Sequence, residues 1–157
     1  MPDAAEADFI ASLPRRYVGS GVLITDDMGR VLMVEPTYKP TWEVPGGVTE
    51  EAESAPAAAR RECLEELGIP VQVGRLLVVE HQTLPGRGDS IMFIYEGGVI
   101  PAGTRLKLPP AELRSCRFVA PDELDTITVP RLANRLRAAL RARARDTVVE
   151  LVDGIPT

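Results

Sequence analysis

Apolar and β-branched residues gather in short runs in the first third of the chain. Residues Tyr17–Thr25 form one such run and residues 30–35 form another, with an Asp-Asp-Met-Gly turn between them at 26–29. Runs of this kind, separated by turn-forming residues, are typical of a β-hairpin. A shorter run at 42–44 follows a loop that contains two prolines. We therefore expect a hairpin and then a short third strand.

A helix is predicted after the glycines that follow this short strand. The three consecutive alanines at 57–59 favour helix formation, and leucines further along supply a packing face. Ser54 is suited to cap the N-terminus of the helix, and Pro56 is tolerated in its first turn. Gly68 is suited to end it. The helix is therefore expected to lie between residues 54 and 68.

The second half of the chain alternates apolar runs with turn residues. The runs at 71–82 and 90–97 flank a loop with a proline and two glycines, so they predict two further strands. Shorter elements are expected as strands at 106–108, 115–119 and 147–152, a helical turn at 121–124, and an amphipathic helix at 129–145. Strands around two principal helices are typical of an α/β/α sandwich built on a mixed β-sheet. At this length we expect one domain over residues 15–157, preceded by a flexible leader at 1–14.

The predicted helix at 129–145 carries six arginines and no acidic residue. Its apolar residues Val129, Leu132, Leu136, Ala139 and Leu140 form one stripe, which predicts that this face packs on the domain. Two interpretations of the arginines stay open. They attract an anionic substrate or partner, or they are solvated and reflect a composition with 16 arginines and 2 lysines.

Composition and charge exclude several classes of protein. The formal net charge of −5 argues against general nucleic-acid binding. No apolar run is long enough to cross a membrane, and the acidic N-terminus does not resemble a signal peptide. We therefore expect a cytoplasmic protein. Cys63 and Cys116 are too few for a disulfide framework, so reduced thiols are expected.

The strongest chemical signal is an acidic helix face. Glu62, Glu65 and Glu66 stand at i, i+3 and i+4 and project from one side of the predicted helix. Like charges at such spacings cost about 0.2–0.5 kcal/mol per pair. A hard divalent cation removes that cost, because such cations prefer carboxylate oxygens as ligands. The cluster predicts a metal site.

The spacing around this cluster carries a family resemblance. The segment Gly47-x5-Glu53-x7-Arg61-Glu62-Cys63-Leu64-Glu65-Glu66-Leu67-Gly68-Ile69 resembles the Nudix box, G-x5-E-x7-R-E-U-x-E-E-x-G-U, with U a bulky apolar residue. Every fixed position matches, with Cys63 as a small hydrophobe at the first apolar position. Around it, the predicted strands agree with the Nudix fold that the resemblance implies.

The resemblance implies roles for residues of the box. It assigns Glu62, Glu65, Glu66 and a carbonyl of Gly47 to a divalent metal, Mg²⁺ or Mn²⁺, and places Glu62 where some members have their general base. It also implies that Arg61 and Glu53 pair across the junction between loop and helix. The implied activity is hydrolysis of the diphosphate linkage in a nucleoside diphosphate linked to another moiety, such as a nucleoside triphosphate, ADP-ribose or another nucleoside diphosphate sugar.

Two other functions stay open. A Nudix-fold module that only binds nucleotides or regulates a partner would be expected to have lost some box residues, and all of them are present. An isomerase of the isopentenyl diphosphate type would call for a catalytic cysteine and glutamate in a different site. We expect a small nucleotide as substrate, no nucleic acid or membrane as partner, and a monomer or homodimer.

Several residues outside the box are further candidates. By resemblance, Glu112, which lies six residues before Phe118, is placed to approach the metals as ligand or base, and Trp42 lies in a strand near the substrate. Arg16 and Tyr17 precede the first strand, where related enzymes often contact the base or sugar.

Weaker candidates are also present. Glu80, Asp89 and Glu96 are weaker candidates for the role implied for Glu112, and we expect them to be solvated carboxylates. His81 has no acidic partner in view, so we expect an ordinary strand residue. Pro85, 16 residues after the box, favours an ADP-ribose-type substrate, whereas the short chain is closer in build to MutT-type enzymes.

Overall fold

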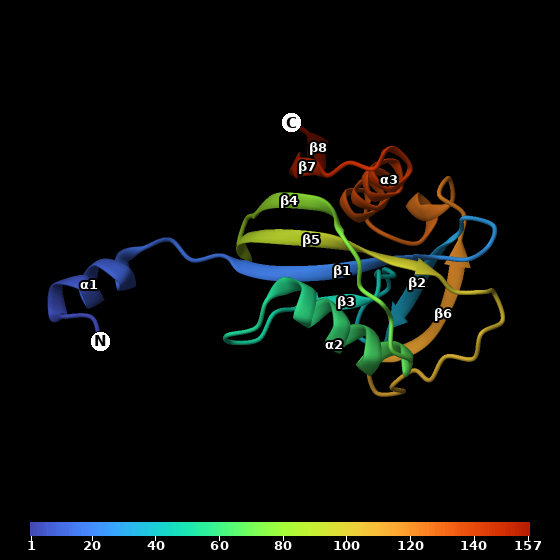
Figure 1. Cartoon of the computed structure of the whole chain (residues 1–157), viewed down its shortest axis with the longest axis horizontal. Helices are drawn as coiled ribbons and strands as arrows, with labels where there is room; N and C mark the ends of the chain where they lie inside the picture. The colour runs from blue at the N-terminus through green and yellow to red at the C-terminus, as the bar shows by residue number, and fades with distance from the viewer.

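The computed structural model describes residues 1–157 as three layers, a helix on each face of one mixed β-sheet (Figure 1). The elements in chain order are α1 (Ala4–Ser12), β1 (Tyr17–Thr25), β2 (Val31–Pro36), β3 (Gly46–Val48), α2 (Ala55–Leu67), β4 (Leu76–Leu84), β5 (Gly88–Val99), β6 (Leu113–Val119), a 3₁₀ turn (Leu124–Thr126), α3 (Pro130–Arg145), β7 (Val149–Val152) and β8 (Ile155–Pro156). The expected α/β/α sandwich is confirmed.

The sheet has the strand order β6-β2-β1-β5-β4-β7-β8, and β3 pairs with β1 beside it. β1 runs parallel to β5 and β4 runs parallel to β7, whereas the other pairs are antiparallel. In β1, Leu23 faces the core under α3, while Val22 and Ile24 face the core under α2. By the same alternation Gly19 and Gly21 lie on the α3 side, where they leave the surface of the sheet without side chains.

The two helices pack because their small residues allow close approach to the sheet. Ala59, Cys63 and Leu67 of α2 join the smaller core cluster. α3 contributes alanines and leucines to the larger one. Ser54 caps α2, since its Oγ accepts from the N–H of Ala57 at 3.4 Å. Gly68 ends α2 with φ 70°. The cap residues predicted for α2 are confirmed.

Three predicted strands differ from the structure. Residues 42–44 form only an isolated bridge between Glu43 and Val34, and β3 begins after Pro45, which has no N–H to donate. The strand predicted at 71–82 begins at Leu76, because residues 70–75 cross from α2 to the sheet. The strand predicted at 106–108 is wrong. It is a loop in which the N–H of Lys107 donates to the carbonyl of Leu67 at the end of α2.

One helix lies outside the sandwich. The leader contains α1, which is capped by Asp3, has no buried residue and extends away from the domain (Figure 1). Phe9, Ile10 and Leu13 are exposed there. No helix of the chain has the length and apolar character that a membrane-spanning helix needs.

Candidate active site

Arg61 and Glu53 join α2 to the loop before it. Nε of Arg61 donates to Oε1 of Glu53 at 2.8 Å, and Nη2 donates to Oε2 at 2.9 Å. The N–H of Glu50 donates to Glu53 Oε2 at 2.9 Å. Hydrogen bonds from Arg61, and then from Glu50, lower the pKa of Glu53 to about 2. The pair implied by the family resemblance is therefore present, and it holds the loop against the helix.

The acidic residues of α2 make different contacts. Nη1 of Arg61 donates to Glu62 Oε1 at 2.9 Å and to Glu65 Oε2 at 3.3 Å. Glu66 instead accepts from the N–H of Gly46 at 2.9 Å. Arg61 thus offsets repulsion between the first two carboxylates, while Glu66 is tied to β3.

Burial sets the titration of two of these carboxylates. The pKa of Glu66 is raised to about 8, mainly by loss of hydration and further by the negative charges of Glu62, Glu112 and Glu43, against the hydrogen bond from Gly46. Burial also raises the pKa of Glu62, with Glu65 and Glu112 adding to the effect and Arg61 opposing it. The protein alone therefore compensates the ionised forms of Glu62 and Glu66 poorly.

Glu112 approaches this cluster from outside the box. It lies just before β6, and its carbonyl accepts from the N–H of Thr37 at 2.8 Å, which fixes the backbone at this point. Its carboxylate is close enough to raise the pKa of both Glu62 and Glu66. The structure brings Glu112 to the acidic face of α2, although its chemical role is a proposal.

The two glycines of β3 bring backbone close to the carboxylates. Gly46 has φ 148°, and a Cβ there would overlap the carbonyl of Ser20 in β1. A Cβ at Gly47 would lie 2.5 Å from Cδ of Glu62. Only glycine leaves room for the Glu62 carboxylate beside this strand.

The donor groups fit a hard divalent cation. Carboxylates of Glu62, Glu65 and Glu66 and the backbone of Gly47 are oxygen ligands of the kind that Mg²⁺ and Mn²⁺ prefer. As they stand, no three acidic, histidine or cysteine side chains converge tightly enough to hold an ion. Arg61 accounts for this, because it draws Glu62 and Glu65 toward its own Nη1. A bound cation would replace Arg61 as the positive charge beside Glu62 and Glu65.

A small cavity opens beside Glu66. Its volume is about 170 Å³, and Gly46, Gly47 and Glu66 lie in its wall. A second cavity of about 400 Å³ adjoins it, since Glu43, Met92 and Arg135 line both. The second cavity is bounded by β4, β5 and the beginning of α3; it is further lined by Gln82, Leu84, Arg87, Val129, Pro130, Arg131 and Leu132. Together the cavities form one cleft that leads away from the acidic cluster.

Comparison with known families agrees with this geometry. Residues 15–142 match the family model described as NUDIX domain. The chain belongs to the Nudix family. It is 40% identical over 67 residues to a MutT-like protein of Streptomyces ambofaciens, a match that covers 43% of each chain. It is 29% identical over 112 residues to a putative 8-oxo-dGTP diphosphatase of Bacillus subtilis (strain 168), covering 71% of this chain and 72% of that one.

Comparison with solved structures supports the Nudix fold. The MutT protein from Methanosarcina mazei Go1 superposes with a TM-score of 0.68 at 23% identity, and the match covers 86% of this chain and 99% of that one. The matched part of this chain spans less than half of the MutT-like relative from Streptomyces ambofaciens, 43% of its length. The family and the fold are therefore shown, while the substrate is not.

The residues predicted to contact substrate lie outside the cleft of this Nudix domain. Trp42 packs against the core cluster under α3, and the guanidinium of Arg117 lies 5.0 Å from its ring centre. Arg16 is 3.5 Å from Asp89 in an exposed ion pair, and Tyr17 is exposed at the start of β1. None of the predicted three lines either cavity.

Sequence reasoning missed Arg135, which is the buried cation of the cleft. It is 6% exposed and pairs through Nε with Oε2 of Glu80, which is fully buried. A signal was available, because Arg135 lies next to Leu136 on the apolar stripe of α3 and Glu80 interrupts an apolar run. A buried acid and a buried base of this kind are expected to pair.

The weaker candidates are paired elsewhere. Arg143 Nε donates to Glu96 Oε2 at 2.7 Å. His81 lies in β4, as expected of a strand residue, and its Nε2 lies 3.2 Å from Oε2 of Glu150, an acidic partner that the sequence did not indicate. The view of the α3 arginines as solvated is also wrong for several of them, since Arg135 and Arg143 bind residues of the sheet. Strand pairing between β4 and β7 explains the histidine contact, because it joins segments far apart in sequence.

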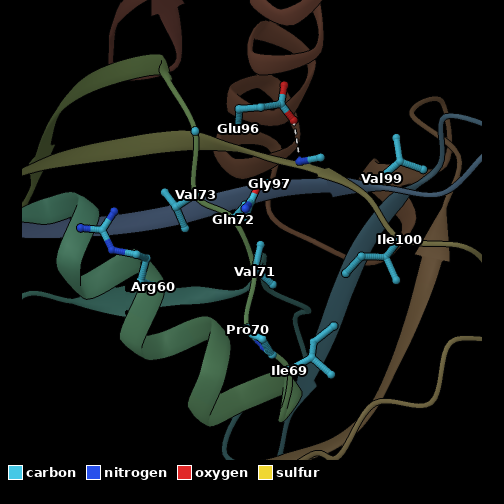
Figure 2. Close-up of a pocket in the computed structure, with 12 residues that line it drawn as sticks. Arg60, Ile69, Pro70, Val71, Gln72, Val73, Glu96, Gly97, Val99 and Ile100 are labelled. Carbon is cyan, nitrogen blue, oxygen red and sulfur yellow. Dashed lines mark hydrogen bonds between the residues drawn. The ribbon is translucent and has the colours of Figure 1, made fainter.

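A cavity of about 820 Å³, larger than either cavity of the cleft, includes none of the acidic residues of α2 in its lining. It lies between α2, the segment 69–74 and the end of β5 (Figure 2). Glu96 is the one acidic residue in its lining, and it accepts from the N–H of Gly98 at 2.7 Å, as Figure 2 shows. Size alone does not mark the site in this Nudix domain.

Proposed function

We propose that this chain is a metal-dependent pyrophosphohydrolase that cleaves the diphosphate linkage of a nucleoside diphosphate joined to another moiety. The observation that carries the proposal is the half-buried carboxylate of Glu66, which lines a cleft beside Glu62 and Glu112 and whose pKa is raised to about 8. Such uncompensated negative charge favours a divalent cation. Membership of the Nudix family supports the same activity.

The proposed metal ligands are Glu62, Glu65, Glu66 and the carbonyl of Gly47. When bound, Mg²⁺ or Mn²⁺ neutralises phosphate oxygens and lowers the pKa of a water molecule. Arg61 and Glu53 keep the loop and α2 in register, so that Gly47 stays beside Glu62. These side chains would therefore set the position of the diphosphate relative to the attacking water.

Glu62 and Glu112 are the proposed acid–base residues. A water oxygen attacks one phosphorus, the bond from that phosphorus to the bridging oxygen breaks, and the water proton passes to a carboxylate. Glu62 is partly buried and its pKa is raised by burial, which makes its carboxylate a stronger base than an ordinary glutamate. Glu112 lies close enough to act electrostatically on the same site.

The substrate range is also a proposal. Similarity to the putative 8-oxo-dGTP diphosphatase of Bacillus subtilis supports nucleoside triphosphates as substrates. A nucleoside diphosphate sugar such as ADP-ribose also fits a cleft with two connected cavities. A cytoplasmic location, a monomeric or homodimeric state and the absence of nucleic-acid partners stay predictions.

Two observations bear on the alternative functions. An isomerase with a catalytic cysteine would need a reactive thiol, whereas burial raises the pKa of Cys63 to about 12 and also raises the pKa of Cys116. A module that only binds nucleotides would have no use for a complete box.

A panel of 8-oxo-dGTP, canonical nucleoside triphosphates, ADP-ribose and nucleoside diphosphate sugars tests the proposal. We expect phosphate, pyrophosphate or nucleotide release from at least one of them with Mg²⁺ or Mn²⁺, and none with excess EDTA. Binding of these compounds without any turnover would instead support the binding module and overturn the proposed activity.

A further inference from the structure

Arg135 presents a buried charge to both cavities of the cleft. It is 6% exposed, and within the protein only its Nε is hydrogen-bonded, to Glu80. A guanidinium has five N–H donors in a planar fork, so Nη1 and Nη2 still have donors available. Arg135 lines both cavities, so this residue lies where the two cavities meet. Donors on a buried cation bind an anionic acceptor strongly.

Two further arginines line the second cavity. Nη1 of Arg131 is buried and has no hydrogen-bond partner, and its Nη2 reaches Asp153 only at 3.8 Å. Arg87 is exposed beside the turn between β4 and β5 and belongs to no ion pair. Three guanidinium groups therefore border one cavity of about 400 Å³.

Glu80 and Asp153 pair with Arg135 and Arg131, but neither of these acids lines the second cavity. The only acidic residue that lines the second cavity is Glu43, and Lys39 pairs with it. α3 also begins at this cavity, and its N-cap residue Val129 makes no side-chain hydrogen bond to the helix. The positive end of the helix dipole adds to the field of the arginines.

The uncharged residues that line the cavity indicate what kind of moiety carries the anionic group. Leu84, Met92 and Leu132 line it together with the arginines. Such a lining accepts the apolar face of a sugar or base, while a few charged groups fix its orientation. The cavity is therefore suited to an organic moiety that carries an anionic group.

We infer that the second cavity is a specificity subsite for an anionic group, phosphate or carboxylate, on one of the two moieties that flank the cleaved diphosphate, the nucleoside or the group joined to it. The inference rests on the proposed function. A diphosphate at Glu66 lies at one end of the cleft, and Arg135 stands at the passage to the other. Arg87, Arg131 and Arg135 then distinguish a substrate with this group from one without it.

Matched pairs of substrates test the inference. UDP-glucuronate and UDP-glucose differ by one carboxylate on the sugar, and ADP-ribose 2′-phosphate and ADP-ribose differ by one phosphate on the nucleoside. We expect kcat/KM to favour the anionic member of at least one pair by about tenfold or more, as one charge-assisted hydrogen bond can supply. Increasing the salt concentration should leave much of the preference, because Arg135 is buried.

Variants locate the preference. Arg87→Gln and Arg131→Gln should each reduce this preference several-fold. Arg141→Gln is the matched control, since Arg141 is exposed on α3 and lines neither cavity. Arg135 is not replaced alone, because that change would leave Glu80 buried without its partner.

Calorimetric binding to the Glu66→Gln variant separates this inference from the proposed function. Tighter binding of the anionic member, lost in the variant that also carries Arg87→Gln, supports the subsite even if no compound is hydrolysed. Turnover with less than twofold preference in both pairs overturns the subsite and leaves the hydrolase proposal standing. An unchanged preference in both arginine variants also overturns it.

Discussion

Arg61 holds Glu53 through two parallel hydrogen bonds, Nε to Oε1 at 2.8 Å and Nη2 to Oε2 at 2.9 Å. The same guanidinium reaches Glu62 and Glu65 with its third nitrogen. One side chain therefore both fixes the loop before α2 and contacts the carboxylates that we propose as metal ligands. Planar, bidentate recognition of this kind requires arginine and is not reproduced by lysine.

The Arg61–Glu53 pair predicts a pH-dependent stability. The pKa of Glu53 falls from 4.5 to about 2 on folding. A lowered pKa means that the carboxylate stabilises the fold above pH 4.5 and that this contribution is lost as the pH falls toward 2. Glu53→Gln should therefore lower the melting temperature at pH 7, and the gap to wild type should narrow toward pH 3. A gap that stays constant across this range would contradict the assignment.

Glu66→Gln should separate activity from folding. The amide still accepts the hydrogen bond from Gly46 and no longer carries a desolvated charge, so the melting temperature of the metal-free protein should stay the same or rise. Turnover should fall by about a hundredfold or more, because a proposed metal ligand is lost. Steady-state kinetics and thermal melts in EDTA check both parts. Wild-type turnover in this variant would refute the metal assignment.

Gly47→Ala tests the close approach of β3 to the acidic face. The added Cβ would lie 2.5 Å from Cδ of Glu62, so the carboxylate must move. We expect about tenfold or greater loss of activity together with weaker Mg²⁺ activation. The neighbouring Val48→Ala serves as control, because Val48 is 52% exposed and its truncation leaves Glu62 in place. Equal activity of the two variants would show that this approach is unimportant.

Glu112→Gln tests the residue outside the box. Glu112 is exposed, so its replacement should change the melting temperature little. If it helps to transfer the proton, kcat should fall by about 10²-fold, and the pH profile of kcat should change shape. Glu51→Gln is a matched exposed control. Full activity with an unchanged pH profile would show that Glu112 has no part in proton transfer.

The buried pair Glu80–Arg135 predicts a large loss of stability when it is broken. Arg135→Met leaves Glu80, which is fully buried, without a cation, and such losses cost about 3–5 kcal/mol. The double variant Glu80→Gln with Arg135→Met should recover most of that free energy of unfolding. Urea denaturation of the two single variants and the double variant measures the coupling. Additive losses would indicate that the two side chains act independently.

Much of the fold was predictable because local signals agreed with tertiary packing. Ser54 and Gly68 delimit α2 through their own backbone preferences, and alternation in β1 follows from burial on both faces. The strand at 42–44 failed because Pro45 and Gly46 move the pairing to residues 46–48. The prediction of a strand at 106–108 was wrong because the N–H of Lys107 donates to the carbonyl of Leu67 at the end of α2. Neither the pairing of residues 46–48 with β1 nor the hydrogen bond from Lys107 to Leu67 can be recognised from nearby sequence.

The candidate site divides in the same way. Glu53, Arg61, Glu62 and Glu66 lie within 14 residues of one another, so a fixed local spacing describes them. Arg135 meets Met92 and Glu43 only because three distant segments converge on the α3 side of the sheet. Arg16 and Tyr17 were expected near substrate from the family resemblance, yet they lie at the exposed start of β1. Long-range convergence leaves no regular interval in the sequence.

The absence of side chains at Gly19 and Gly21 on the α3 face of β1 has a consequence for divergence within the family. Met92, Val44 and Ile94 occupy the space beside these glycines, and none of the three belongs to the acidic cluster. Substitutions there would reshape the floor of the cleft while leaving Glu62 and Glu66 on α2 untouched. Selection can therefore alter which compound is accepted without rebuilding the hydrolytic apparatus, and paralogues of this chain should differ first at these floor positions.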